Sequence, residues 1–323
     1  MNERAELQYR AATQYYLQDQ TMEQIARELG VSRPTVSRLI AQARAAGMVR
    51  ISVDHGAGAS SPHARALEDA FGVRVHLVPV RATASPTRRR DDVARRAASL
   101  LADVVDDHHT IGVAWGATMA ALARQLPRRP LEGATVVQMN GGVNRVLSGL
   151  PYVSEILQAV GDAFDAEVVL FPVPAFFDHV ETRQAMWRER SVRHIQGLLH
   201  GLDVAVFGVG SLTAALPSHV YAGGYLDDGE REQLRSEGVV GDVCTILLRE
   251  DGTWADIGAN QRATGLRPPE LARARRRLCV VADPQRASAL VAALRAGVVT
   301  DLVLDTATAQ ATVARLGGTR GVR

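Results

Sequence analysis

The 323-residue sequence contains no lysine, so all 37 of its basic residues are arginine. This excludes every mechanism that needs a lysine amine, such as a Schiff base with a substrate, attachment of pyridoxal phosphate or the lysine of a P-loop. Any cationic contact to a phosphate must therefore come from a guanidinium group, whose planar fork suits phosphate geometry. With 35 acidic residues, the formal net charge is only +2, so the chain as a whole is not a polycation.

Cysteines and long apolar runs are also scarce. Cys244 and Cys279 are the two cysteines, too few for a disulfide framework and typical of a reducing compartment. No apolar run reaches the roughly 18 residues of a membrane helix, and the charged start MNERAELQYR is unlike a secretory signal. Since 46% of the residues are hydrophobic, we expect a cytoplasmic, globular protein of two domains with no membrane partner.

The N-terminal segment has the pattern of two short helices that follow a longer one. Apolar spacing predicts a helix over 3–17. Thr21 and Gln24 then form a capping-box pattern that opens a helix over 22–29. Gly30 permits the left-handed backbone conformation at which that helix would end.

A further helix is expected after one tight turn. Ser32 is a suitable N-cap, and Pro34 falls in the first turn, where the missing N–H has no cost. The spacing of Ala26, Gly30 and Val36 is typical of a helix-turn-helix, in which small residues let two helices cross closely. The outer face carries arginines and hydroxyls, which contact phosphates and base edges. An ordinary helical hairpin with a solvated polar face is the alternative. The predicted DNA-binding residues are Thr21, Gln24, Ser32, Arg33, Pro34, Thr35, Ser37 and Arg38.

The next stretch predicts the boundary between two domains. MVRISV (48–53) is typical of a short strand that would pack as a wing, and DHGAGASSPH is rich in Gly, Ser and Ala, as linkers are. We expect a DNA-binding domain over 1–54, a linker over 55–62, and an effector-binding and oligomerisation domain over 63–323.

Strand and helix patterns alternate in the second domain, which predicts a doubly wound α/β fold with a parallel sheet. We expect a polar loop with solvated arginines over 81–90, a helix over 91–105, and a solvated helix face over 273–277. The clearest strands are TIGVAWG (110–116), VVQMNGG (136–142), VAVFGVGS (204–211) and LCVVADP (278–284).

In such sheets, ligands bind beside the carboxyl ends of the strands. The glycines there let backbone N–H groups approach an anion, and a helix that begins at Ala117 would add its positive dipole. No turn is a complete dinucleotide fingerprint, so no nicotinamide cofactor is expected. The side chains of His108 and His109 are adjacent in sequence and point apart, so no metal site is expected either. The residues placed at this crevice are Trp115, Gly116, Thr118, Asn140, Gly141, Gly142, Gly208 and Gly210.

Taken together, the order of these motifs resembles the SorC family of sugar-responsive bacterial transcription regulators over nearly the whole chain. IARELGVSRPTVSRLIAQARAAGMVRISV is similar to the family's DNA-binding segment. GVAWGATM, VVQMNGGV, FPVPAF, FGVGSL, VVGDV and DPQRASALVAALRAGVVTDLVLDTATA follow in the family's order. The resemblance implies an effector domain related to sugar-phosphate isomerases and CoA transferases, a sugar-like effector, and assembly into dimers or tetramers.

The resemblance also implies roles for individual positions. The Trp115–Met119 turn would hold an effector phosphate, Asn140–Val143 would line the sugar, and Asp242 would bind effector hydroxyls. Arg286 stands where many members have a lysine near the phosphate, and its planar fork changes the geometry of that contact. The complete set of predicted effector-binding residues is Trp115, Gly116, Ala117, Thr118, Met119, Asn140, Gly141, Gly142, Val143, Gly208, Gly210, Asp242 and Arg286.

The prediction is a regulator without cofactor or catalytic residues, whose binding to a roughly palindromic operator is controlled by a sugar, polyol or sugar phosphate. Two alternatives stay open. One is a sugar-phosphate isomerase or hydrolase fused to a DNA-binding module, with a carboxylate such as Asp242 as general base. The absence of lysine and of a Gly-x-Ser-x-Gly motif argues against it. The other is a DNA-binding oligomer that responds to no ligand.

Overall fold

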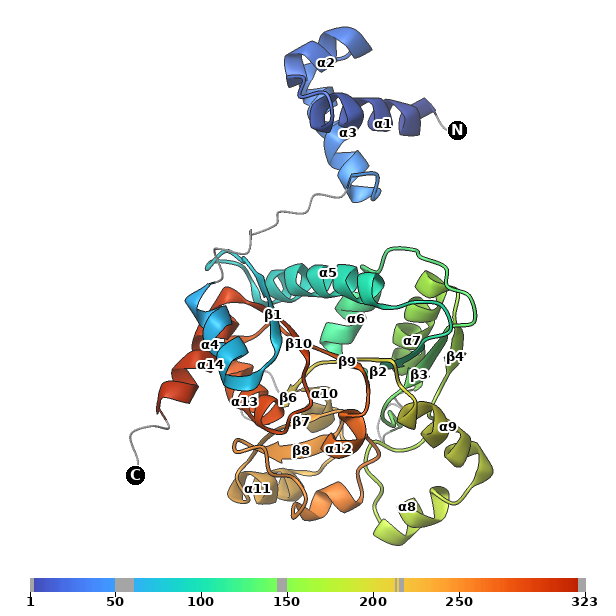
Figure 1. The fold of residues 1–323 in the computed structure, drawn as a ribbon, viewed down its shortest axis with the longest axis vertical. Helices are drawn as coiled ribbons and strands as arrows, with labels where there is room; N and C mark the ends of the chain where they lie inside the picture. Colours follow the sequence, from blue (N-terminus) through green and yellow to red (C-terminus); the bar gives the residue numbers. More distant parts are fainter. Residues whose placement is uncertain (1–2, 50–60, 144–149, 213, 215–217, 319–323) are drawn as a thin grey trace. The chain divides into compact units, whose positions relative to one another are not determined.

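The contacts within the chain divide it into two compact units, residues 1–59 and 60–323. Among the described residues, no helix is both long and apolar enough to cross a membrane. The computed structural model describes residues 3–49, 61–143, 150–212, 214 and 218–318 (Figure 1).

Three helices form the first unit, and their bounds confirm the predicted helix-turn-helix. They share one small core because each contributes an apolar stripe at helical spacing. The predicted wing strand begins with Met48 and Val49, which lie in no strand, and the rest of it falls outside the described residues. The helices are α1 (Glu3–Tyr16), α2 (Met22–Leu29) and α3 (Arg33–Ala45). The buried core residues are Ala11, Ile25, Val36, Leu39 and Ile40.

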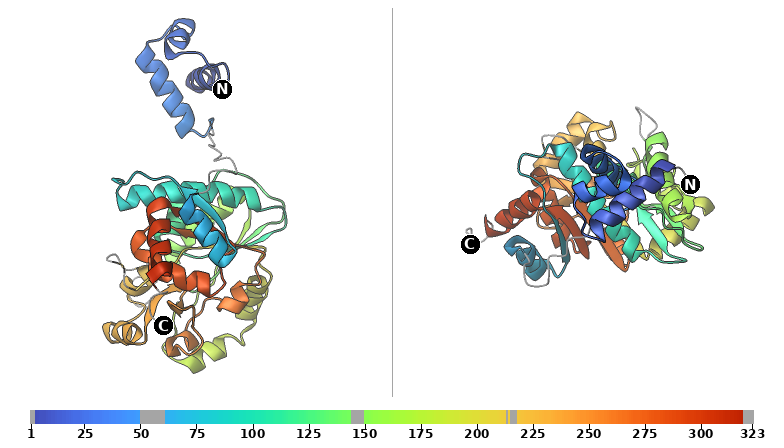
Figure 2. Two further views of the ribbon diagram at one scale, coloured as in Figure 1. Left: turned by 60° about the vertical axis from the view of Figure 1, so that its left-hand side comes forward. Right: turned by 90° about the horizontal axis from the view of Figure 1, so that it is seen from above.

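A parallel sheet of seven strands forms the centre of the second unit, with helices packed around it (Figures 1 and 2). This confirms the predicted α/β architecture. The strand order is β1-β10-β9-β5-β2-β3-β4, so the chain leaves β2 on one side through β3 and returns on the other through β5. Such a reversal opens a crevice at the carboxyl ends of the two flanking strands. The strands are β1 (Arg74–Val78), β2 (Thr110–Val113), β3 (Thr135–Gln138), β4 (Glu167–Val169), β5 (Val204–Phe207), β9 (Arg276–Val281) and β10 (Asp301–Asp305).

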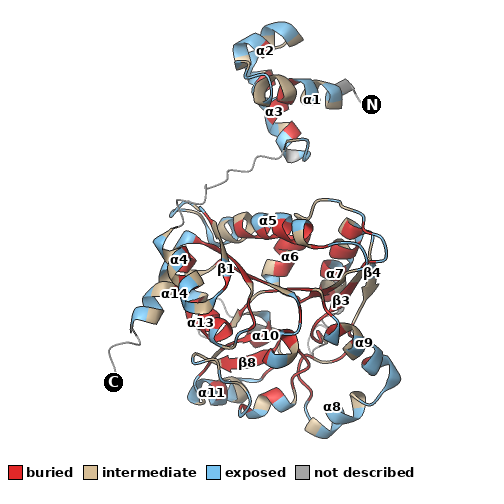
Figure 3. Cartoon of the chain, in the orientation of Figure 1, coloured by how far each residue is buried: buried red, intermediate tan, exposed pale blue. Residues whose placement is uncertain are grey.

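The central strands are almost wholly apolar and buried on both faces, as strands of a covered parallel sheet are. Figure 3 shows this buried core along the strands and the inner faces of the helices. The helices are α4 (Pro62–Phe71), α5 (Pro86–Val104), α6 (Ala117–Ala123), α7 (Leu150–Phe164), α8 (Val180–Met186), α9 (Arg190–His200), α10 (His219–Ala222), α11 (Asp228–Ser236), α12 (Pro268–Leu271), α13 (Ala287–Arg295) and α14 (Thr306–Gly318).

A second, antiparallel sheet follows β5 in the chain and was not predicted from the sequence. It consists of β6 (Gly210–Ser211), β7 (Val239–Val243) and β8 (Ile246–Arg249). Gly210 pairs with Asp242 in its register. This pairing brings Asp242 to the carboxyl end of β5, where the predicted crevice lies.

Two sequence-based assignments are wrong. The polar loop expected over 81–90 ends at Ser85, which caps α5 by accepting from the Arg88 N–H, so the helix begins at Pro86 rather than at Asp91. A Ser-Pro pair is typical of a helix start, but the run of arginines after it is also typical of a solvated loop. The helix face expected over 273–277 is also absent, because Arg276 and Arg277 begin β9.

Candidate functional site

The turn between α2 and α3 has the geometry that the sequence predicted. The Thr21 hydroxyl accepts from the Gln24 N–H, and the Gln24 side chain accepts from the Thr21 N–H at 2.8 Å. Gly30 ends α2 with φ +66°, which is the left-handed region where glycine is strongly favoured. Ser32 then caps α3 by accepting from the Thr35 N–H. Both helix starts are therefore set by local hydrogen bonds.

The outer face of α3 is exposed and carries the predicted polar groups. Several of them have local partners: Arg33 pairs with Glu23 of α2 at 2.8 Å, and the hydroxyls of Ser32 and Thr35 lie 2.8 Å apart. Arg38 donates to the Thr35 hydroxyl at 3.4 Å. These are solvent-accessible contacts, which DNA phosphates or base edges can replace. The exposed residues among those predicted to bind DNA are Thr21, Gln24, Ser32, Arg33, Pro34, Ser37 and Arg38, and Thr35 is half-buried.

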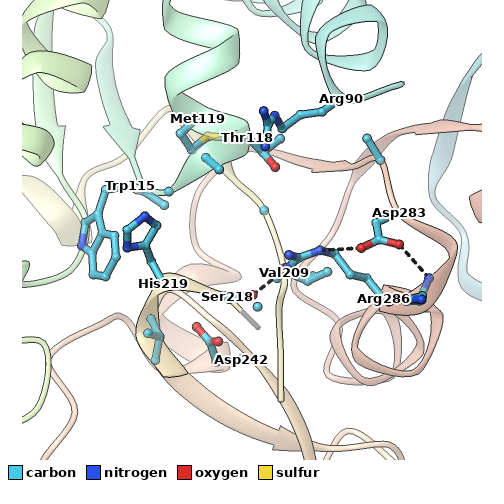
Figure 4. A pocket seen from close by; sticks show the side chains of 18 of the residues that line it. Arg90, Trp115, Thr118, Met119, Val209, Ser218, His219, Asp242, Asp283 and Arg286 are labelled. Atoms are coloured by element: carbon cyan, nitrogen blue, oxygen red, sulfur yellow. Dashed lines mark hydrogen bonds and ion pairs between the residues drawn. The ribbon is translucent and has the colours of Figure 1, made fainter. Parts of the chain in front are cut away.

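A cavity of about 570 Å³ lies at the carboxyl ends of the parallel strands in the second unit (Figure 4). We call it the strand-end cavity. Its walls come from the loops after β2, β3, β5 and β9, from the start of α5, from α10 and from β7. The predicted residues that line it are Trp115, Gly116, Ala117, Thr118, Met119, Asn140, Gly208, Gly210, Asp242 and Arg286.

The other three predicted effector residues lie beside the cavity and do not line it. The Gly141 N–H donates to the Thr264 hydroxyl at 3.0 Å. Gly142 packs against Val153, and Val143 forms a β-bridge with Pro174. Their loop follows β3, and its backbone turns away toward Thr264 after Asn140.

Two buried oxygens at the cavity have no hydrogen-bond partner within the described part of the chain. They are Asn140 Oδ1 and Asp242 Oδ1. Both residues line the cavity, with exposed fractions of 2% and 5%. Buried polar atoms of a folded protein are nearly always hydrogen-bonded, so these two oxygens mark a place where a donor is missing.

Among the described residues, one backbone N–H group and one hydroxyl group approach the carboxyl of Asp242. Its Oδ2 accepts from the Thr245 N–H at 3.0 Å. The Tyr221 hydroxyl lies beside it without the geometry of a direct hydrogen bond. Burial raises the pKa of Asp242, while Tyr221, the Thr245 N–H and the charge of Arg286 oppose that shift. A hydroxyl donor from a ligand would further stabilise the ionised form.

Arg286 lines the cavity, but its guanidinium already has protein partners. It donates to the Val209 carbonyl at 2.8 Å and to the Ser218 hydroxyl at 2.6 Å, and Asp283 lies 3.6 Å from its Nε (Figure 4). These contacts join the loop after β9 to the segment before α10. Arg286 therefore has a structural role in the cavity wall whether or not it also meets a ligand.

Aromatic side chains pack against Trp115 and His219, two residues that line the cavity. The Trp115 ring stacks on Tyr225 with centroids 5.3 Å apart, and its Nε1 donates to the Gly141 carbonyl at 3.0 Å. His219, which lines the cavity, stacks on Tyr152 at 5.3 Å. His219 and Tyr152 were missed in the sequence because their ring contact joins helices far apart in the chain.

Two arginines at the start of α5 are further cavity residues that sequence reasoning missed. Arg89 and Arg90 both line the cavity. Arg89 was expected in solvent, yet its side chain is 11% exposed and pairs with the buried Asp305. The helix start at Ser85-Pro86 was the available clue, since it places Arg89 and Arg90 on the first turns of a helix beside the sheet. The described residues contain no group of three or more His, Cys, Asp or Glu placed to hold a metal ion.

The comparisons with known proteins agree with this architecture. Residues 59–314 match the family described as "Putative sugar-binding domain", and residues 9–58 match the MarR family. The deoxyribonucleoside regulator of Bacillus subtilis (strain 168) is 28% identical over 311 residues, which cover 96% of this chain and 98% of the relative.

The chain is also similar to proteins of known structure. A domain of a possible sugar-binding transcriptional regulator from Arthrobacter aurescens TC1 is 44% identical, with a TM-score of 0.75, over 79% of this chain and 100% of that one. The full-length sorbitol operon regulator SorC from Klebsiella pneumoniae shares the fold, with 24% identity and a TM-score of 0.77 over 95% of this chain and 98% of its own. With its helix-turn-helix and its sugar-binding domain, the chain belongs to the SorC family of sugar-binding transcriptional regulators.

Proposed function

We propose that this protein binds a DNA operator through α3 and that a sugar, polyol or sugar phosphate in the strand-end cavity controls this binding. The observation that carries the proposal is a pair of buried oxygens, Asn140 Oδ1 and Asp242 Oδ1, for which the described part of the chain supplies no hydrogen-bond partner. A hydroxyl group is the donor that both oxygens lack, and a compound with several hydroxyls can satisfy both. Two of the relatives are a deoxyribonucleoside regulator and a sorbitol operon regulator.

Operator recognition rests on the exposed face of α3. In a helix-turn-helix, the second helix enters the major groove with its first residues at the base edges. Arg33 and Arg38 are the cations of that face, and Ser37 adds a hydroxyl. Assembly into a dimer or tetramer would place two such helices one helical turn of DNA apart, and the operator would then be roughly palindromic.

The regulation needs no chemical step. The curated relatives matched here are named as regulators, and we propose that this chain likewise has no catalytic activity. A ligand that favours one arrangement of the DNA-binding units changes operator affinity by its coupling free energy, typically about 1–3 kcal/mol. This corresponds to a change of about 5-fold to 150-fold.

The test begins with selection of an operator from random duplex DNA by the full-length protein. Operator affinity is then measured by fluorescence anisotropy with a panel of sugars, polyols and their phosphates. At least one compound should change the affinity by fivefold or more. The Asp242→Asn variant should keep its operator affinity but lose the response to that compound.

Two results would contradict the proposal. If no sequence is enriched in the selection, α3 does not recognise an operator. If the operator is bound but no compound changes the affinity, the ligand-independent oligomer is the correct description. The Arg38→Ala variant, whose substitution lies outside the cavity, serves as the control with weakened DNA binding.

A further inference from the structure

A groove of about 380 Å³ lies beside α8, and its described lining residues are all different from those of the strand-end cavity. We call it the α8 groove. Its walls come from the start of α8, the loop after β8, the 3₁₀ helix Gly258–Gln261 and Arg267, which precedes α12. Every residue of α8 is at least partly exposed (Figure 3). The volume of the groove is within the range of sites that bind small molecules.

The guanidinium of Arg183 in α8 has a fixed orientation in this groove. Its Nε donates to the Ala263 carbonyl at 2.7 Å. The guanidinium also lies over the Trp187 ring, 4.2 Å from the ring centroid, and that ring packs against the buried Phe171 and Phe177. Among the described residues, the two terminal Nη groups have no hydrogen-bond partner, so the donor fork of Arg183 is oriented but unused.

Arg267 brings a second guanidinium to the groove, and the described lining residues include no Asp or Glu. Arg267 is exposed and forms no ion pair with a described residue. Glu270 does not line the groove: it accepts from the Arg267 backbone N–H at 2.8 Å, and its other oxygen lies 3.9 Å from His200. Burial lowers the pKa of Arg183, the charge of Arg267 lowers it further, and Glu270 opposes that shift. An anion between the two guanidinium groups would relieve both the burial cost and the repulsion.

We propose that the α8 groove binds a small oxyanion, a phosphate or a carboxylate, between the guanidinium groups of Arg183 and Arg267. The oriented fork of Arg183 donates two parallel hydrogen bonds to the anion, and Arg267 adds a second positive charge. Gln184 and Gln261 line the groove and supply amide donors, and Trp254 provides an apolar side. This site is additional to the strand-end cavity and does not depend on the function proposed for that cavity.

The tryptophans provide a readout that distinguishes the two sites, because the sequence contains three of them in three places. Trp254 lines the α8 groove, Trp115 lines the strand-end cavity, and Trp187 lies under the guanidinium of Arg183. The full-length protein is labelled with fluorotryptophan, and its fluorine NMR resonances are assigned through single Trp→Phe variants. It is then titrated at constant ionic strength with inorganic phosphate, with succinate and with the neutral succinamide.

Phosphate, succinate or both should shift the Trp254 resonance in a saturable way, and succinamide should not. Arg267→Gln should bind the anion about 10-fold more weakly or worse, as expected for the loss of a charge-assisted contact. Arg183→Lys keeps the charge but loses the planar fork, so it should weaken binding as well. Arg188→Gln is the matched control, because Arg188 is an exposed arginine just after α8 that does not line the groove. Its affinity should equal that of the wild type.

The outcomes separate the kinds of anion and the two sites. A Trp254 shift with phosphate alone identifies a phosphate site, a shift with succinate alone identifies a carboxylate site, and a shift with both identifies a general oxyanion site. The proposal is overturned if neither anion shifts the Trp254 resonance at millimolar concentration, or if succinamide shifts it equally. It is also overturned if Arg267→Gln and Arg183→Lys both bind as tightly as the wild type. A shift of the Trp115 resonance alone would place the anion in the strand-end cavity and remove the α8 groove as its site.

Discussion

Gly210 lies directly against the carboxyl group of Asp242. A Cβ atom added to Gly210 would lie 1.8 Å from Asp242 Oδ1, and the two residues are paired in the register of β6 and β7. The absence of a side chain at position 210 is therefore what lets Asp242 take its place in the wall of the strand-end cavity.

Substitution of Gly210 by Ala should displace the Asp242 carboxyl. We expect a loss of about 1–3 kcal/mol in the free energy of unfolding, because the added methyl overpacks a buried site. Effector affinity should fall more than tenfold, as measured by calorimetry with the strongest ligand of the panel. Gly197→Ala is the control, since a Cβ at Gly197 in α9 would have no neighbour within 4 Å. An unchanged affinity in Gly210→Ala would show that Asp242 does not bind the effector.

The Arg89–Asp305 pair should contribute strongly to stability. Asp305 is fully buried and also accepts from the N–H groups of Ala307 and Thr308. Arg89→Gln leaves a buried carboxylate without its cation, and we expect a loss of about 3 kcal/mol in denaturant unfolding. Arg88→Gln removes an exposed ion pair, so its effect should stay below about 1 kcal/mol. Equal effects in both variants would contradict this account.

Asp301 should make the folding free energy sensitive to acid. Burial alone would raise the pKa of Asp301, but His76, Thr300, Arg276 and Arg74 together lower it to about 2. The Arg276 guanidinium contacts both carboxylate oxygens at 3.0 Å.

The direction in which stability changes with pH follows from proton binding by the folded and the unfolded chain. The unfolded chain, in which the pKa of Asp301 has its ordinary value of 3.8, binds the Asp301 proton more readily than the folded chain does. Stability from this group is therefore present above pH 4 and is lost as the pH falls toward 2, by about 1–2 kcal/mol. Denaturant unfolding from pH 5 to 2 should show this loss in the wild type, relative to Asp301→Asn. Parallel pH profiles of the two proteins would disprove it.

Substitution of Glu23, which pairs with Arg33, is expected to increase the affinity for DNA. Glu23 holds Arg33 at 2.8 Å on the exposed face of the helix-turn-helix. Glu23→Gln removes a negative charge from that face and releases Arg33, so operator affinity should rise, most clearly at low salt.

Arg33→Ala and Arg38→Ala should act in the opposite direction. Each should weaken operator binding by about 1–3 kcal/mol if its guanidinium contacts a base. The thermal stability of both variants should stay close to that of the wild type, because exposed ion pairs add little. Anisotropy titrations over a range of salt concentrations measure these effects. Unchanged affinity in both variants would remove the assignment of α3 as the recognition helix.

Features that depend on neighbouring residues were predicted well from the sequence. The capping box at Thr21, the turn at Gly30 and the cap at Ser32 each arise within four residues of chain, so local sequence is sufficient to specify them. The short apolar strands were equally clear, because a strand covered on both faces has to be apolar throughout. The start of α5 was not predicted although its Ser85-Pro86 pair is local, because three consecutive arginines are also typical of a solvated loop.

Features that depend on distant residues were not predictable. Arg89 meets Asp305, which is 216 positions away, and Arg286 meets Ser218, which is 68 positions away. The arginines of a local run look alike in sequence, so their differing partners could not be inferred. For the same reason the sequence did not show that Arg286 joins two segments of the cavity wall, and its contact with an effector stays a prediction.

By itself, the sequence determined the helix-turn-helix, the succession of parallel strands and the glycine-containing turns at their ends, because caps and hydrophobic periodicity act over a few residues. The tertiary structure decided which of those turns line the cavity and which arginines do: Arg89, which pairs with Asp305, and Arg90, whose Nε has no hydrogen-bond partner among the described residues. Asn140 lines the cavity, whereas the next residue, Gly141, donates its N–H to Thr264. Arg90 lines the cavity next to Arg89, which is paired with Asp305. Such differences arise from the packing of segments far apart in the chain, and the folded arrangement alone brings those segments together.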